Sequence, residues 1–89
     1  TGTSALPLAE TAVIQISDFS FDGDTEVLLG QRIRFTNQDG TSHTATSDIF
    51  DTGTITSGEA VEVTPDRTGT FTYYCLFHGG MAGTVTVTE

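Results

Sequence analysis

The last part of the chain contains three side chains that bind soft metal ions, at intervals of three residues. They are Cys75, His78 and Met81, and the first and last are the only cysteine and the only methionine of the sequence. The other of the two histidines, His43, lies near the middle of the chain. One thiolate, two imidazoles and one thioether suit copper, if folding brings His43 to the other three. Zinc sites usually contain more thiolates or three harder ligands with a water, and iron–sulfur clusters need several cysteines.

This set of ligands suits one-electron chemistry. Sulfur stabilises Cu(I) and imidazole stabilises Cu(II), and two histidines and a cysteine in one plane with a long axial methionine are typical of blue-copper electron-transfer sites. The alternative for Cys75 is a buried structural thiol, and for Met81 a filler of the core. Either histidine has the alternative of an ordinary loop or hydrogen-bonded residue. The spacing favours the copper site over these alternatives.

Alternating apolar residues predict the strands that must position these ligands, and no segment shows a convincing helical period. The predicted strands are residues 12–16 with Phe19 and Phe21 continuing the alternation, 26–29, 32–36, 43–46, 60–64, 70–75 and 84–88. Cys75 then ends one strand, His78 and Met81 lie on the loop to the last strand, and His43 begins a strand of its own.

Seven or eight short strands separated by turn residues predict an all-β fold, most simply an antiparallel sandwich. An SH3-like or OB barrel fits the same periodicity. Residues 11–89 are expected to form one domain, and residues 1–10 a flexible lead or tether. The aromatic residues expected first of all in the core are Phe19, Phe21, Phe35 and Phe71.

The charge of the chain excludes some partners. Three arginines, no lysine and twelve acidic residues give a net charge of −9, so neither nucleic acid nor an anionic membrane surface is expected to bind. Most acidic residues, Asp39 among them, are expected on a solvated surface. No apolar run is long enough for a membrane-spanning helix. A docking partner with a basic surface would suit this charge.

In its motifs the chain resembles the cupredoxins, and specifically small plastocyanin- or amicyanin-like type I copper proteins. The resemblance covers residues 11–89, and its short Cys–His–Met loop is most similar to that of amicyanin. The matching segments are Phe19 with Phe21, Gly30-Gln31 with Ile33 and Phe35-Thr36-Asn37, Ser42-His43-Thr44, Phe50-Asp51-Thr52-Gly53, Gly69-Thr70-Phe71 with Tyr73-Tyr74-Cys75, and Met81 with Gly83-Thr84-Val85 and Val87. The resemblance implies a cupredoxin-like Greek-key β-sandwich of about seven to eight strands, with one copper ion at one end.

The resemblance also implies a role for each site residue. His43, Cys75 and His78 would be the equatorial ligands and Met81 the axial one. His43 would donate its other ring N–H to a backbone carbonyl, which fixes its tautomer. His78 would be the electron port, within a patch formed by Leu76, Phe77, His78, Gly79 and Gly80.

Three positions next to the ligands differ from the usual family pattern. Ser42 stands where proline is common before the first histidine, and Phe77 where proline is common before the second. Thr44 stands where asparagine often ties the two ligand loops together, and its hydroxyl is expected to make the same link.

The function implied is that of a monomeric electron carrier between redox partners, not an enzyme. Such carriers usually work in the periplasm or outside the cell, and residues 1–10 would suit a membrane tether upstream of residue 1. The alternatives are a copper-binding domain or subunit of a larger oxidase or reductase, a copper chaperone, and a β-sandwich interaction module with an inert cysteine. An independent copper enzyme would need further histidines for a second copper site, and the chain has only two.

Overall fold

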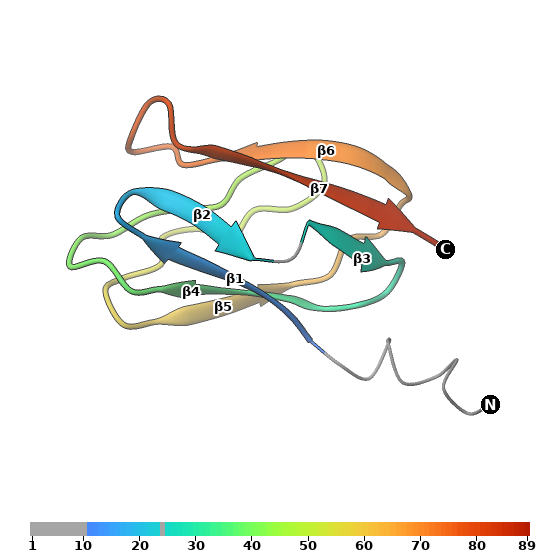
Figure 1. The fold of residues 1–89 in the computed structure, drawn as a ribbon, viewed down its shortest axis with the longest axis horizontal. Helices are drawn as coiled ribbons and strands as arrows, with labels where there is room; N and C mark the ends of the chain where they lie inside the picture. Colours follow the sequence, from blue (N-terminus) through green and yellow to red (C-terminus); the bar gives the residue numbers. More distant parts are fainter. Residues whose placement is uncertain (1–10, 24) are drawn as a thin grey trace.

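Two β-sheets pack face to face in the computed structural model, which describes residues 11–23 and 25–89 (Figure 1). The strands are β1 (Ala12–Ser17), β2 (Ser20–Gly23), β3 (Glu26–Leu28), β4 (Ile33–Asn37), β5 (Ala60–Val63), β6 (Gly69–Tyr74) and β7 (Ala82–Thr88). One sheet has the order β2-β1-β4-β5 and the other β3-β7-β6. The prediction of an all-β sandwich is confirmed, and the two barrel alternatives are wrong.

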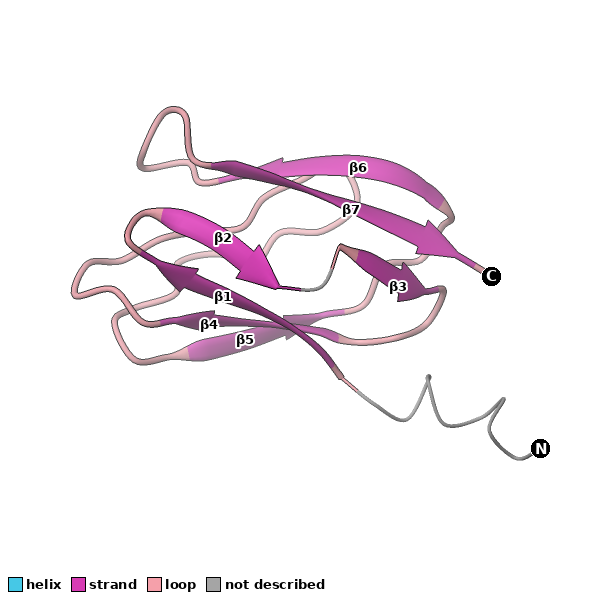
Figure 2. Cartoon of the chain, in the orientation of Figure 1, coloured by secondary structure: helices cyan, strands magenta, loops and turns pink. Residues whose placement is uncertain are grey.

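The sheets are mixed, whereas the sequence had suggested antiparallel pairing throughout. β1 pairs in parallel with β4, and β3 pairs in parallel with β7, while the other pairs are antiparallel. The reason is that the chain crosses between the sheets after β2, β3 and β5. When it comes back to a sheet, the new strand can run in the same direction as an earlier strand of that sheet and pair with it in parallel. Figure 2 shows these connections as loops, with no helix among the described residues.

Alternation decides which side chains enter the core between the sheets. In β1 the side chains of Ala12, Ile14 and Ile16 are buried, and those between them face outward. In β4 the side chains of Ile33 and Phe35 are fully buried, while both neighbouring arginines are exposed. Burial of apolar area on this scale, at about 25 cal/mol per Å², is the main stabilisation of so small a domain. Of the four phenylalanines expected in the core, Phe35 is fully buried, and Phe21 and Phe71 are partly buried and pack against the core cluster.

Phe19 is an exception, because its side chain is 51% exposed and does not enter the core. The predicted first strand stops at Ser17, and Asp18 and Phe19 form a two-residue turn with φ angles of 53° and 58°. Two positive φ angles in succession give the tight turn that matches the twist of a hairpin. The chain therefore reverses at Phe19, and the alternation of β1 does not continue through it.

The predicted strand 43–46 is also absent. His43 and Thr46 instead form isolated bridges, His43 with Ile55 and Thr46 with Asp51 and Tyr74. The backbone of Thr46 exchanges two hydrogen bonds of 2.9 Å with Tyr74 of β6. This irregular segment therefore leaves the sheet of β4 and β5 and lies against β6, which is how His43 arrives beside the end of β6.

All the predicted metal ligands lie at one end of the sandwich. In Figure 1 the β6–β7 loop and the β1–β2 turn lie at the end opposite the carboxyl terminus and the start of β1. Within the described part of the chain, no helix is long and apolar enough to cross a membrane. The predicted flexible lead, residues 1–10, lies outside the described residues.

Tyr73 is buried in the core, and this burial gives the protein a pH dependence in the alkaline range. Burial raises the pKa of Tyr73 from 10.0 to about 12. Below pH 10 the phenol is protonated in both states, but between pH 10 and 12 only the unfolded chain releases the proton, so stability falls as the pH rises. We expect Tyr73 to account for a loss of about 2 kcal/mol in the free energy of unfolding over this range.

The test is urea unfolding at pH 9 and pH 11.5 for the wild type and Tyr73→Phe. The phenylalanine variant lacks the titrating group and should lose markedly less stability between the two pH values. Equal losses in the two proteins would contradict the prediction.

Candidate metal centre

The β6–β7 loop carries three of the four predicted ligands and is held closed by its own backbone. Cys75 follows β6 directly, and its N–H donates a 3.0 Å hydrogen bond to the carbonyl of Met81, just before β7. The N–H of Met81 donates to the carbonyl of His78 at 3.4 Å. The side chains of Cys75 and Met81 are buried, and His78 is half-buried at the rim. The loop thus turns its two sulfur-bearing residues inward and leaves His78 near the surface.

His43 reaches this loop from the long connection between β4 and β5. Its backbone exchanges hydrogen bonds of 3.1 and 2.7 Å with Ile55, and its side chain is fully buried. Asn37, also fully buried, donates its side-chain amide to the carbonyls of Thr41 and Ile55 at 2.9 and 2.8 Å. The end of β4 therefore fixes the two backbone segments between which His43 is held.

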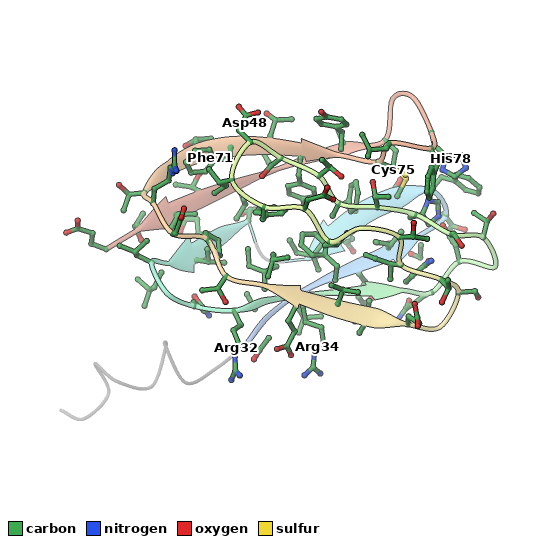
Figure 3. All side chains as sticks on the ribbon, turned by 180° about the vertical axis from the view of Figure 1, so that it is seen from behind. Arg32, Arg34, Asp48, Phe71, Cys75 and His78 are labelled. Carbon is green, nitrogen blue, oxygen red and sulfur yellow. The ribbon has the colours of Figure 1, made fainter. Side chains whose placement is uncertain are left out.

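The structure brings together one ligand atom from each of His43, Cys75 and His78, all within 4.8 Å of one another. The Cys75 Sγ lies 3.7 Å from Nδ1 of His43 and 3.6 Å from Nδ1 of His78. Figure 3 shows the Cys75 and His78 side chains next to each other at one end of the sandwich. A metal bonded to nitrogen at about 2.0–2.1 Å and to sulfur at about 2.3 Å, with bond angles near 110–120°, would hold these atoms about 3.6–3.8 Å apart. The observed separations fit one shared ion.

Asp39 fixes the tautomer of His43. Its Oδ2 lies 2.8 Å from Nε2 of His43, so this nitrogen carries the ring proton and donates a hydrogen bond to the carboxylate. Nδ1 is then the unprotonated nitrogen, and its lone pair faces the sulfur of Cys75. A carboxylate that orients a histidine in this way is typical of metal ligands.

The expectation that His43 donates to a backbone carbonyl was therefore wrong. Asp39 was expected on a solvated surface, but only 12% of its side chain is exposed. The N–H of Phe19 is the largest cause that lowers the pKa of Asp39 below its ordinary value; burial opposes it, and His43 lowers the pKa further. The signal in the sequence was its place four residues before His43, directly after a predicted strand.

Hydrogen bonds stabilise the thiolate of Cys75. Burial raises the pKa of the thiol, whereas the N–H groups of Thr44 and Phe77 donate to the sulfur and lower its pKa. The Thr44 N–H lies 3.4 Å from the Cys75 Sγ. These two donors favour the thiolate, which is the form of cysteine that binds metal.

Thr44 links the two segments that carry the ligands. Its hydroxyl accepts a 2.9 Å hydrogen bond from the N–H of Leu76, which is the link expected from the sequence. Ser42 is half-buried beside His43, and its role stays a prediction.

The residues predicted to form the electron-port patch with His78 are exposed, and the patch itself stays a prediction. Leu76 and Phe77 are 58% and 52% exposed, and Gly79 and Gly80 are exposed as well. Phe19 adds a third large apolar side chain here, and sequence reasoning missed it because its place depends on the β1–β2 turn. The donor set, together with this rim, suits a buried metal with one ligand near solvent.

Comparisons with known proteins agree with this geometry. A family model described as "Copper binding proteins, plastocyanin/azurin family" matches residues 10–88. A reduced variant of amicyanin superposes with a TM-score of 0.78 at 21% identity, over 89% of this chain and 83% of that one. A second amicyanin variant, described as a reduced Cu(I) form at pH 4, gives a TM-score of 0.76 at 21% identity, over 86% of this chain and 81% of that one. At these identities the amicyanin structures establish the fold.

A larger protein contains a similar domain. The copper-containing nitrite reductase from Thermus scotoductus SA-01 superposes with a TM-score of 0.80 at 25% identity. The match covers 90% of this chain but only 23% of the reductase chain. No curated protein sequence matches the chain.

Proposed function

Because the chain belongs to the plastocyanin/azurin family of copper-binding proteins, we propose that it is a type I copper protein that passes single electrons between redox partners. The observation that carries the proposal is the arrangement at Cys75. A thiolate and two imidazole Nδ1 atoms converge at separations that fit one ion, and Asp39 leaves the His43 Nδ1 unprotonated. This donor set fits copper, the cofactor of the family.

His43, Cys75 and His78 would hold the copper, and Met81 would be a weaker fourth ligand. Bound there, the metal would supply a one-electron Cu(II)/Cu(I) couple. The protein contributes a rigid surround, because the Thr44 hydroxyl and the Asp39 carboxylate fix both ligand segments before the metal binds. A fixed surround keeps the rearrangement between the two oxidation states small.

The electron would enter and leave at the half-buried edge of His78. Leu76 and Phe77 give a partner an apolar contact around this edge, while the charge of −9 favours a partner with a basic surface. Membership of the family favours the periplasm or the cell exterior for such an exchange. A monomer that carries electrons, and does not itself act on a substrate, is the simplest form of this function.

The similarity to nitrite reductase supports a second candidate, a domain that serves a larger copper reductase. Both histidines of the 89 residues belong to the one cluster, so a further copper site with histidine ligands would need another chain or segment. Electron transfer is the role of the domain in either case.

The test is a Cu(II) titration of the metal-free protein, followed by visible absorption and EPR spectra. We expect an intense visible band that saturates at one copper per chain, narrow copper hyperfine splitting, and reversible bleaching by a reductant. Weak, broad spectra or no stoichiometric binding would overturn the proposal and leave an interaction module with an inert cysteine.

Substitution of Met81 is expected to change the reduction potential while copper stays bound. The axial ligand tunes the potential, whereas the three stronger ligands determine the affinity. Met81→Leu keeps the apolar volume of this buried side chain and removes only its sulfur. Voltammetry should show a higher potential, because the thioether no longer donates to Cu(II). An unchanged potential would mean that Met81 only fills the core.

A further inference from the structure

The ring of Phe19 lies against both histidines of the metal centre. Its centroid is 5.1 Å from that of His43 and 4.8 Å from that of His78, with interplanar angles of 88° and 86°. These are edge-to-face contacts, which are favourable for aromatic rings. Phe77, the neighbour of His78 in the loop, is farther from its ring, at 6.5 Å. Phe19 is therefore a packing contact that the two histidines share.

The backbone of Phe19 is held in an unfavourable conformation. Left-handed φ angles of 53° and 58° at Asp18 and Phe19 are uncommon for residues other than glycine, and least suited to a bulky side chain. Such conformations persist only where the surroundings impose them, and they concentrate at functional sites. The strained turn is thus an independent sign that the position of Phe19 matters.

Asp39 imposes this conformation through the same carboxylate that binds His43. Its Oδ1 accepts from the N–H of Asp18 at 2.7 Å, and its Oδ2 accepts from the N–H of Phe19 at 3.0 Å. The Oδ2 also accepts from Nε2 of His43 at 2.8 Å. One carboxylate therefore fixes the turn relative to the buried His43 and places the Phe19 ring against the half-buried His78 as well.

His78 is the ligand that needs such support. His43 is fully buried and hydrogen-bonded through its ring, whereas His78 is half-buried on a loop that continues into two exposed glycines, Gly79 and Gly80. The backbone hydrogen bond that the His78 carbonyl accepts from Met81 is long, at 3.4 Å. The orientation of a half-exposed imidazole on such a loop depends on the rings that pack against it. These are Phe19 at 4.8 Å and His43 at 4.9 Å, and of the two only Phe19 is not itself a predicted ligand.

We propose that Phe19 is a positioning residue that keeps the His78 imidazole turned with Nδ1 toward Cys75. The role of this contact rests on the proposed function: Phe19 would keep His78 in place when the copper is reduced. Phe19 should restrict the rotation of the His78 ring in the metal-free protein as well.

The experiment compares wild type, Phe19→Ala, Phe19→Tyr and Phe71→Ala. Alanine keeps a Cβ at the strained position, so the turn itself is changed little, while tyrosine restores the ring. Phe71 is a matched control, because it is a partly buried phenylalanine that Figure 3 shows far from Cys75 and His78. Imidazole NMR relaxation dispersion is measured on the metal-free and Cu(I)-loaded proteins, and the reduction potential by voltammetry.

We expect Phe19→Ala to raise the population of displaced His78 conformers by about two- to tenfold, the range expected for loss of an aromatic pair. His43 should remain ordered, tyrosine should restore the wild-type behaviour, and Phe71→Ala should leave His78 unchanged. In the copper protein the potential should rise in Phe19→Ala, because a loosened imidazole favours Cu(I). An equally ordered His78 in Phe19→Ala and wild type would overturn the proposal.

The experiments distinguish failure of the proposed function from failure of the role proposed for Phe19. If the wild type binds no copper stoichiometrically, the electron-carrier role fails in the titration. The relaxation of His78 in the metal-free proteins still decides whether Phe19 positions the ring.

Discussion

Cys75→Ser is expected to abolish the intense visible absorption of the copper-loaded protein and to weaken copper binding strongly. The colour of such a site comes from charge transfer between thiolate sulfur and Cu(II), and Cys75 is the only cysteine of the chain. Its sulfur also accepts the N–H of Thr44, which favours the thiolate form that binds metal. A serine hydroxyl stays protonated at neutral pH and gives copper only a weak, hard donor in place of a soft one. The measurements are visible absorption, EPR and copper affinity by competition with a chelator.

The fold should survive this substitution, since serine is nearly isosteric with cysteine and can still accept the Thr44 N–H. Ala45→Ser is a matched control, because Ala45 is fully buried near the same segment and its substitution introduces a similar buried hydroxyl without removing the sulfur. It should retain full colour. Persistent colour in Cys75→Ser would refute Cys75 as a ligand, and loss of colour in Ala45→Ser would attribute the effect to disturbed packing.

Local patterns were enough to predict the strands and the ligand loop. Alternation along β1 and β4 is a property of neighbouring residues, and Ile14, Ile16, Ile33 and Phe35 occupy the core as it indicates. The spacing of Cys75, His78 and Met81 places all three on one loop whichever way the rest of the chain folds. These features depend on residues close in the sequence, so the sequence alone can reveal them.

Features that depend on the meeting of distant segments were missed. Phe19 continues the alternation of β1 as a pattern, but the turn there reverses the chain and brings its ring to two histidines from other segments. The role of Asp39 requires His43 on one side and the β1–β2 turn, about twenty residues earlier, on the other. The place of Asp39 four residues before His43 is a weak local signal, and it does not show that the two side chains meet. The parallel pairing of β1 with β4 could not be predicted either, because it depends on how the chain crosses between the two sheets.

Asp39→Ala is expected to lower copper affinity by about 10–100-fold, the range found when the hydrogen-bond partner of a metal-binding histidine is removed. Two effects add in the same direction. His43 loses the acceptor that keeps the proton on Nε2, so the tautomer protonated on Nδ1, which cannot bind the metal, becomes populated. The N–H groups of Asp18 and Phe19 lose their acceptors, so the strained turn relaxes and its contact with both imidazoles weakens.

The variants Asp39→Asn and Asp66→Ala separate these effects from a simple loss of charge. Asp66 is 74% exposed on the β5–β6 connection, at the end of β6 remote from Cys75, so its removal changes the net charge equally without touching the site. It should leave the affinity almost unchanged. Asparagine keeps one acceptor oxygen, which can accept a hydrogen bond from the turn or from His43, but it places no negative charge beside the imidazole. The copper affinity of Asp39→Asn should therefore lie between those of the wild type and Asp39→Ala. If Asp39→Ala bound copper as tightly as Asp66→Ala, the metal alone would be sufficient to orient His43, and the carboxylate would serve only the turn.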